Sequence, residues 1–237
     1  MYQAPSRDFF THPVRRRFHF VVCSLFGLWY RALWDLRLHD MARIPSRDTG
    51  YIVAVNHLSN WDPPLIAAMF LPTQVAFLGK IELFGHPILA WVMDNLAVIC
   101  LDRAKVAVST IKLAKLAVSQ PGWCLGIFPE GTRRRKAVEG ESAAEEAAAN
   151  ATHAAGQVEA KKGVAFMAKM TGAPVLPVAI WTVPKGNGLF ARAQLHMAVG
   201  ELLPFPKSGA KGEAAEAELT AYTQTLMATI EALKAKS

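Results

Sequence analysis

The chain has 237 residues, a formal net charge of +7 and a pI near 9.5. This length suffices for one substantial core, and the positive charge predicts an anionic partner: nucleic acid, a phosphorylated substrate or an anionic membrane. Hydrophobic residues make up 52% of the chain and the mean hydropathy is +0.19, which favours the membrane. Cys23, Cys100 and Cys124 stand far apart in apolar runs, a pattern that argues against disulfides and cysteine-bound metal and predicts free thiols in a reducing compartment.

The most apolar N-terminal segment is Phe18–Tyr30, which follows Arg15, Arg16 and Arg17 and precedes Arg31. As a helix it would be about 20 Å long, whereas the hydrocarbon core of a bilayer is about 30 Å thick. We therefore expect a helix that lies in the membrane interface, where each basic side chain gains roughly 1 kcal/mol from anionic lipid. An amphipathic helix packed on the main domain is the alternative.

We assign residues 1–45 to this N-terminal basic and aromatic segment and residues 46–237 to the main domain. The first apolar run starts only near Phe18 and lacks a small-residue cleavage pattern, so a cleavable secretory signal is not expected. The main domain should then lie on the cytoplasmic face of the inner or plasma membrane, in a monotopic or peripheral protein.

Beyond Pro45 the sequence alternates between β-rich runs and segments with helical periodicity. This alternation predicts an α/β fold with a central, mostly parallel or mixed β-sheet flanked by helices. The expected strands are residues 51–55, 75–78, 97–101, 124–128, 175–180 and 195–199, and the expected helices include residues 63–70, 87–93, 103–119 and 161–170.

Two further segments have a distinctive composition. Residues 137–160 are rich in alanine and glutamate and contain no lysine or arginine, which predicts a weakly packed surface insertion, with a gating role as the alternative. Residues 213–236 predict a C-terminal helix that docks by one apolar face. That face comprises Leu219, Tyr222, Leu226, Ile230 and Leu233.

A histidine and an aspartate follow the first predicted strand, in the sequence NHLSNWD of residues 56–62. In one interpretation Asp62, which precedes Pro63 and Pro64, is only a helix N-cap. In the other, His57 is a general base and Asp62 orients its ring. The two interpretations are compatible, and the spacing alone is weak evidence for catalysis.

A second polar group follows the strand predicted at residues 124–128, in the sequence FPEGTR of residues 128–133. Backbone donors, a hydroxyl and a guanidinium can converge there on an oxyanion, and ligands of α/β sheets bind at such strand ends. Lys80 and Arg103 also follow predicted strands and could reach the same rim, although each could be a simple helix-terminus charge. The candidate anion-binding residues are Glu130, Gly131, Thr132, Arg133, Lys80 and Arg103.

Together these motifs resemble the glycerolipid acyltransferases, a family typified by 1-acylglycerol-3-phosphate (lysophosphatidic acid) acyltransferase. Four blocks occur in the family's order over roughly residues 50–180: residues 56–62, residues 79–84 with 101–103, residues 128–133, and residues 173–178. The chain departs from the family pattern at Arg134, where serine is common, near Asn95, where glycine is common, and in a longer link from Arg133 to residues 161–163. These departures leave the acceptor and the shape of the site open.

The resemblance implies attack of a glycerol hydroxyl on an acyl thioester, with acyl-CoA or acyl-carrier protein as the donor substrate. His57 would remove the hydroxyl proton and Asp62 would hold the imidazole. Arg133, with the turn of Glu130 to Thr132, would grip the acceptor phosphate, and Lys80 and Arg103 would add positive charge. Pro174 and Pro177 would shape the wall of the acyl pocket or merely pack the strand. Neither a metal nor a bound cofactor is expected.

Lysophosphatidic acid is the expected acceptor, which gives phosphatidic acid in phospholipid biosynthesis. Glycerol-3-phosphate, other lysophospholipids and lyso-aminolipids are acceptors of sister enzymes and stay open. The expected partners are an anionic membrane surface, the lysophospholipid and the thioester donor, and not nucleic acid.

The positive charge and the scattered histidines leave two other classes of function as alternatives. A metal hydrolase would need ligands that the scattered histidines do not supply, and insensitivity to chelators would exclude it. A non-catalytic membrane-binding or nucleic-acid-binding module would explain the charge but neither strand-end motif, and thiol release from a thioester would exclude it.

Overall fold

The computed structural model describes residues 8–102, 107–129, 162–184 and 193–235. A seven-stranded sheet forms the centre of this part of the chain, with the strand order β1-β7-β6-β2-β5-β3-β4. All neighbouring strands pair in parallel except β6 and β7, which are antiparallel. The strands are β1 (Asp35–His39), β2 (Ile52–Val55), β3 (Gln74–Lys80), β4 (Ile99–Leu101), β5 (Trp123–Ile127), β6 (Val175–Val183) and β7 (Gln194–Val199). The predicted α/β fold with a mostly parallel, mixed sheet is therefore confirmed.

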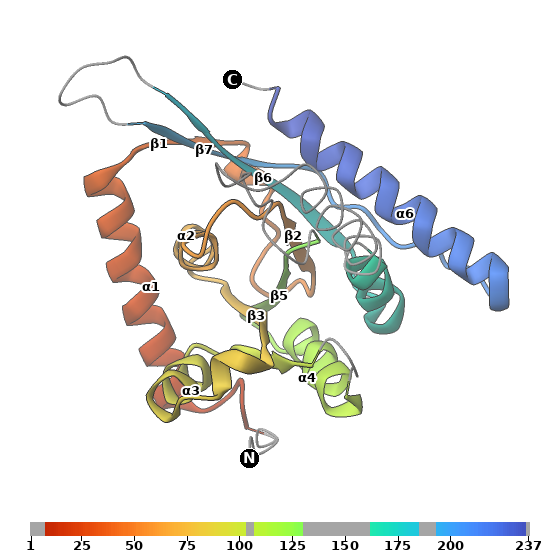
Figure 1. Ribbon diagram of the computed structural model, residues 1–237, viewed down its shortest axis with the longest axis horizontal. Coiled ribbons are helices and arrows are strands. Elements are labelled where there is room, and N and C mark those ends of the chain that lie inside the picture. The colour runs from red at the N-terminus through yellow and green to blue at the C-terminus, as the bar shows by residue number, and fades with distance from the viewer. Residues whose placement is uncertain (1–7, 103–106, 130–161, 185–192, 236–237) are drawn as a thin grey trace, which may run out of the picture.

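Helices cover both faces of the sheet (Figure 1). On one face lie α1 (Pro13–Leu33) and α2 (Asp62–Met69); on the other lie α4 (Val108–Ser119), a helix at residues 162–171 and α6 (Gly212–Leu233). The shorter α3 (Pro87–Asn95) lies near the start of α1. Two short 3-10 helices, η1 (Met41–Arg43) and η2 (Ile81–Phe84), follow β1 and β3. Residues 103–106 of the helix predicted at 103–119 lie outside the described residues, as does the insertion predicted at 137–160.

The central strands are apolar on both faces because each face meets a layer of helices. In β2, Val53 and Val55 belong to the core shared with α1 and α2, whereas Ile52 and Ala54 belong to the core shared with α4 and α6. Successive side chains of a strand point to opposite faces, so the continuous apolar run divides into two sets. The molecule thus has two cores, one on each side of one sheet.

Strand β1 was not predicted. It pairs with β7 in parallel, from Asp35 opposite Gln194 to His39 opposite Ala198. Leu36 and Leu38 pack toward the core shared with α1 and α2, while the alternate residues are polar, as expected of a strand at the edge of a sheet. The sheet therefore begins before residue 46, within the N-terminal segment of residues 1–45.

Helix α1 packs on the domain by one narrow face. Its buried residues His19, Cys23, Gly27 and Tyr30 recur at helical spacing, and its contacts with α2 are extensive. Large apolar side chains on other faces, such as Leu25 and Leu28, are exposed. In the described part of the chain, no helix combines the length and hydropathy that crossing a membrane requires.

Candidate active site

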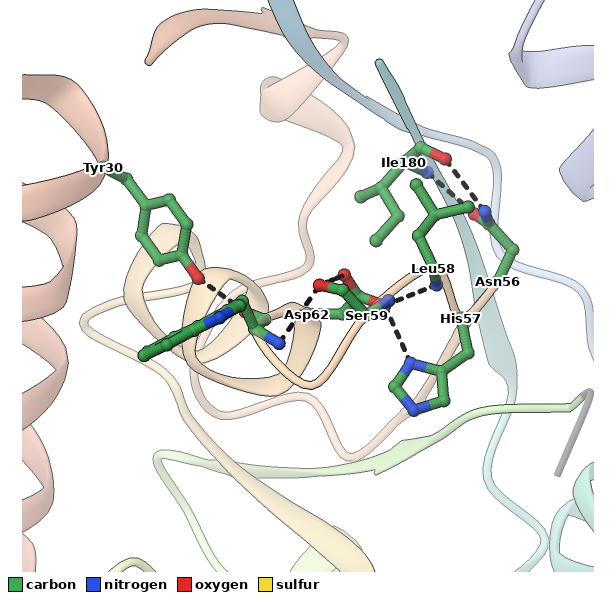
Figure 2. Close-up of polar contacts among 8 residues, drawn as sticks. Tyr30, Asn56, His57, Leu58, Ser59, Asp62 and Ile180 are labelled. Carbon is green, nitrogen blue, oxygen red and sulfur yellow. Dashed lines mark hydrogen bonds and ion pairs between the residues drawn. The ribbon is translucent and has the colours of Figure 1, made fainter. Parts of the chain in front are cut away.

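The chain leaves the sheet at the carboxyl end of β2 and presents His57 at once. The ring nitrogen Nδ1 of His57 lies 2.7 Å from Oδ2 of Asp62, at the first turn of α2. Figure 2 shows the imidazole beside this carboxylate, with its second nitrogen turned away. The side chain of His57 is 16% exposed and that of Asp62 is 6% exposed, so the pair is largely sheltered while one edge of the ring stays accessible.

The carboxylate of Asp62 also organises the turn between β2 and α2. Its Oδ2 accepts hydrogen bonds from the backbone N–H groups of Leu58 (2.6 Å) and Ser59 (2.7 Å), and its Oδ1 accepts one from the Ser59 hydroxyl (3.1 Å). These donors precede Asp62 in sequence. The side chain therefore faces the preceding turn, and the residue at the N-cap of α2 is Trp61, which makes no side-chain capping hydrogen bond.

Aromatic rings support the face of the imidazole. The ring of Phe128, just beyond β5, stacks on His57 with 4.3 Å between centroids. Phe77 of β3 stacks in turn on Phe128 at 5.5 Å. Gly126 makes room for this stack, because a Cβ at that position would lie only 2.4 Å from the ring of Phe77. Two strands of the sheet thus help to hold the orientation of His57.

A buried tyrosine connects α1 to the same turn. The hydroxyl of Tyr30 donates a hydrogen bond of 2.6 Å to the backbone carbonyl of Trp61, the residue before Asp62. Burial, with a smaller effect of the Asp62 charge, raises the pKa of Tyr30, so the phenol stays protonated and remains a donor. The turn is therefore held from α1 as well as from the sheet.

This geometry suits general-base chemistry at the second nitrogen of His57. A carboxylate can only accept, so Nδ1 must carry the proton and, in the neutral ring, Nε2 keeps its lone pair. A positioned imidazole of this kind removes a proton from a nucleophile and can contribute about 10²–10⁴-fold to a rate. Asp62 fixes the tautomer and stabilises the imidazolium that forms.

The other predicted polar residues follow strands that end at the same edge of the sheet. Lys80 is the exposed last residue of β3, and it pairs with Leu101 at the end of β4. Strand β5, which precedes the FPEGTR motif, lies between β2 and β3. Arg103, Glu130, Gly131, Thr132 and Arg133 themselves lie outside the described residues.

Comparisons with known proteins identify the family of the chain. A family model described as Acyltransferase matches residues 35–181, more than half of the chain. The chain belongs to the acyltransferase family. It is 27% identical over 178 residues to a 1-acyl-sn-glycerol-3-phosphate acyltransferase of Streptococcus pneumoniae, covering 73% of this chain but only 59% of that protein. A Bacillus subtilis protein of the same name is 25% identical over 202 residues, 85% of this chain and 89% of that protein.

A solved structure resembles the fold of this acyltransferase. It is the crystal structure of the 1-acyl-sn-glycerophosphate (LPA) acyltransferase from Thermotoga maritima, with a TM-score of 0.55 and 27% sequence identity. The match covers 90% of this chain and 81% of that one. The expected family is thus confirmed.

The two prolines proposed for the acyl pocket do not adjoin His57 in this acyltransferase. Pro174 precedes β6 at the amino end of the strand, whereas His57 follows the carboxyl end of β2. The carbonyl of Pro174 accepts a hydrogen bond from the N–H of Ile52. Pro177 pairs with Ala54 within the sheet, and its Cγ lies near Gly200 on the α6 side. The structure therefore places both in strand packing, while their proposed contact with an acyl chain stays a prediction.

An apolar groove of about 470 Å³ opens beside the turn between β2 and α2, residues 57–62, which is the candidate catalytic turn. Its walls come from α1 and from the turn itself: Val22, Leu25, Phe26, Trp29 and Trp61. Trp61 is 54% exposed and precedes Asp62 directly. The groove therefore places an apolar surface beside the turn that carries Asp62.

Sequence reasoning missed three residues that hold the turn: Tyr30, Ser59 and Phe128. Ser59 stands three residues before Asp62 in the same turn, close enough for its hydroxyl to reach the carboxylate, so a local signal existed. Phe128 belongs to the FPEGTR motif, which does not indicate that its ring stacks on His57. Tyr30 lies 31 residues before Trp61, the residue whose carbonyl it bonds. Their contacts depend on how α1 and β5 pack around β2.

Proposed function

We propose that this acyltransferase moves an acyl group from acyl-CoA or acyl-carrier protein to the free hydroxyl of 1-acylglycerol-3-phosphate. The product would be phosphatidic acid, for phospholipid biosynthesis. The observation that carries the proposal is the His57–Asp62 pair, in which Nδ1 faces the carboxylate and Nε2 is turned away from it (Figure 2), as suits a base for an incoming hydroxyl. The names of the relatives from S. pneumoniae, B. subtilis and T. maritima favour the lysophosphatidic acid acceptor.

The proposed reaction needs no nucleophile from the protein. The acceptor oxygen attacks the thioester carbonyl carbon as its proton passes to Nε2 of His57. The tetrahedral intermediate then collapses, the carbon–sulfur bond breaks, and the thiolate takes the proton back from the imidazolium. Asp62 stays ionised throughout and stabilises the positive ring. The products are the ester and a free thiol.

Binding of the acceptor would place its hydroxyl at His57, a gain of position more than of chemistry. In this proposal Arg133 grips the phosphate together with Glu130, Gly131 and Thr132, and Lys80 and Arg103 add positive charge. The groove formed by α1 and Trp61 is the proposed site for an acyl chain, because its walls are apolar and it adjoins the catalytic turn.

The protein is further proposed to bind an anionic membrane peripherally, on its cytoplasmic face. The outer side of α1 exposes Val21 (53%), Leu25 (61%) and Leu28 (66%), beside exposed Arg17 and Arg31. Trp91 of α3 is 58% exposed and packs on Phe18 of α1 with 5.4 Å between centroids, so the apolar surface extends to α3. Apolar and basic groups on one surface favour a lipid interface.

The proposal is tested by thiol release from an acyl thioester in the presence of detergent or vesicles. Release should require a lysophospholipid acceptor, and His57→Ala should lower the rate by about 10²–10⁴-fold without unfolding the chain. His12→Ala, at an exposed histidine before α1, is the matched control and should keep full activity. Near-wild-type turnover by His57→Ala would sink the mechanism.

The same assay with a panel of acceptors identifies the acceptor that this protein prefers. Lysophosphatidic acid should give the highest kcat/KM, above glycerol-3-phosphate, other lysophospholipids and a lyso-aminolipid. A preference for one of those would keep the chemistry and replace the acceptor. Acyl-CoA and acyl-carrier protein are compared in parallel to identify the donor.

A further inference from the structure

The residue before His57 makes an unusual pair of contacts. The side-chain amide of Asn56 donates from Nδ2 to the backbone carbonyl of Ile180, and its Oδ1 accepts from the backbone N–H of the same residue, both at 2.8 Å. Asn56 is 1% exposed and Ile180 is fully buried. Figure 2 shows the two parallel bonds between the amide and the β6 backbone.

These two bonds continue the hydrogen-bond ladder between β2 and β6. The ladder between β2 and β6 pairs Val55 with Val178, and Ile180 is the next β6 residue that points its backbone groups toward β2. The side chain of Asn56 occupies the place that the next stretch of β2 backbone would have taken. The main chain is therefore free to turn away from β6 and carry His57 over the ring of Phe128.

We propose that Asn56 is a positioning residue, whose amide replaces the main chain in the β2–β6 ladder and so fixes the point at which His57 leaves the sheet. Only a side chain with one donor and one acceptor in a plane, at this length, can make both bonds. The proposal rests on the role of His57 as the base. It adds that the base is held from its backbone side by Asn56, as its ring is held by Asp62 and Phe128.

Two substitutions and one control test the proposal. Asn56→Leu keeps the volume and removes both bonds; Asn56→Asp keeps the shape and the acceptor but removes the donor. Gln74→Leu is the control, because Gln74 is also buried and bonds a distant backbone carbonyl, that of Arg16, at 2.7 Å, but at the opposite edge of the sheet. All three should lower the Tm.

Only the Asn56 variants should lower kcat, by at least tenfold, with the KM for the acceptor within threefold of wild type. If Asn56→Leu does not fold, Asn56→Asp carries the comparison. Equal losses of kcat in the Asn56 and Gln74 variants at equal loss of Tm would overturn the proposal, because the effect would then be general destabilisation.

Hydrogen exchange gives a readout that does not depend on activity. The N–H groups of Leu58 and Ser59 are bonded to Asp62, so their protection reports the order of the catalytic turn. This protection should fall at least tenfold in the Asn56 variants and persist in Gln74→Leu. Retained protection together with near-wild-type kcat in Asn56→Asp would refute the positioning role. Loss of protection in the Asn56 variants would support the positioning role of Asn56. This result is independent of the activity of His57→Ala, which tests the proposed chemistry.

Discussion

At the scale of single residues, Asp62 combines two tasks in one carboxylate. One oxygen accepts three hydrogen bonds, from Nδ1 of His57 and from the backbone of Leu58 and Ser59, and the other accepts the Ser59 hydroxyl. Charge-assisted hydrogen bonds are about twice as strong as neutral ones. The same negative charge that orders the turn therefore also orients the imidazole and stabilises its protonated form.

The charge of Asp62 can be separated from its shape. In Asp62→Asn the amide oxygen can take the place of Oδ2, and the amide nitrogen can donate to the Ser59 hydroxyl, so the turn should persist. Loss of the charge should nevertheless lower kcat by about 10²–10⁴-fold, because the imidazolium is no longer stabilised. Thiol-release kinetics and circular dichroism measure the two effects.

Ser59→Ala is the matched variant, since it keeps the charge and removes the hydroxyl, which donates to Oδ1 of Asp62 and accepts from the N–H of Trp61. Its kcat should fall less than about tenfold, because only one of these two bonds reaches the carboxylate and one hydrogen bond contributes about 1 kcal/mol. Equal losses in the two variants would mean that charge is not the decisive property of Asp62.

At the scale of secondary-structure elements, β3 and β5 are shaped to support the imidazole. Gly126 of β5 leaves the space that the Phe77 ring of β3 occupies, and Phe77 stacks on Phe128, which stacks on His57. A glycine inside a strand ordinarily weakens it. Here its lack of a side chain allows two neighbouring strands to place an aromatic stack beneath the ring.

Gly126→Ala should disturb this stack. The added Cβ would lie 2.4 Å from the Phe77 ring and 2.8 Å from Cγ1 of Val75, so overpacking should cost about 1–3 kcal/mol of unfolding free energy. We also expect kcat to fall several-fold as the rings shift. Urea unfolding and steady-state kinetics are the measurements.

Gly163→Ala is the control, because a Cβ there would meet no described atom within 4 Å and the helix at 162–171 gains up to about 1 kcal/mol from alanine. It should be neutral or stabilising. A Gly126→Ala variant as stable and active as wild type would show that the stack is dispensable.

At the scale of the whole molecule, α1 joins the sheet through a buried polar contact. The Nε2 atom of His19 lies 3.3 Å from the carbonyl oxygen of Val75, and its ring packs edge-on against Trp123. Burial lowers the pKa of His19 to about 4, against which the hydrogen bond to Val75 acts only in part. The neutral ring, with its proton on Nε2, is therefore the form that the folded protein binds.

The stability of the fold should depend on pH through His19. Its pKa is near 6.5 when unfolded and about 4 when folded, so its contribution is complete above pH 6.5 and is lost as the pH falls toward 4. The loss should reach about 3 kcal/mol. Urea unfolding of wild type and His19→Gln at pH 7.5, 6 and 4.5 tests this, since their difference in unfolding free energy should narrow with acid. Parallel curves would contradict the expectation.

The proposed lipid-binding surface of α1 can be tested on the intact protein. The double variant Leu25→Glu/Leu28→Glu places two negative charges on the exposed face of α1 and should lower binding to anionic vesicles at least tenfold, because anionic lipid repels them. Sedimentation with vesicles measures the bound fraction, and added salt should weaken wild-type binding.

Val108→Glu, which adds one negative charge, is the control for vesicle binding and is compared with the single variant Leu28→Glu. Val108 is 68% exposed, close to the exposure of Leu28, but lies on α4, away from α1 (Figure 1). This variant should bind vesicles nearly as wild type does. Equal loss in both variants would mean that net charge, rather than the α1 surface, governs binding.

The sequence by itself determined the family, the α/β class and the positions of most strands, because apolar runs and short motifs are local patterns. It also brought His57 and Asp62 together as candidates, since five residues within one turn can meet without help from the rest of the chain. The stripe of α6 that packs on the sheet followed from helical periodicity, whereas the apolar run Phe18–Tyr30 indicated α1 but not its ends at Pro13 and Leu33. Strand β1 did not, because five alternating residues between a helix and a turn carry too weak a pattern.

Only the tertiary structure decided how the imidazole is held. Phe128 reaches it from β5, Tyr30 reaches the turn from α1, and Asn56 bonds Ile180, which is 124 residues away in sequence. The tertiary structure also placed Pro174 at the amino end of β6, away from the carboxyl end of β2 where His57 lies, which the motif alone did not indicate. Such contacts join segments distant in sequence, and their geometry depends on strand order and helix packing, which no local pattern encodes.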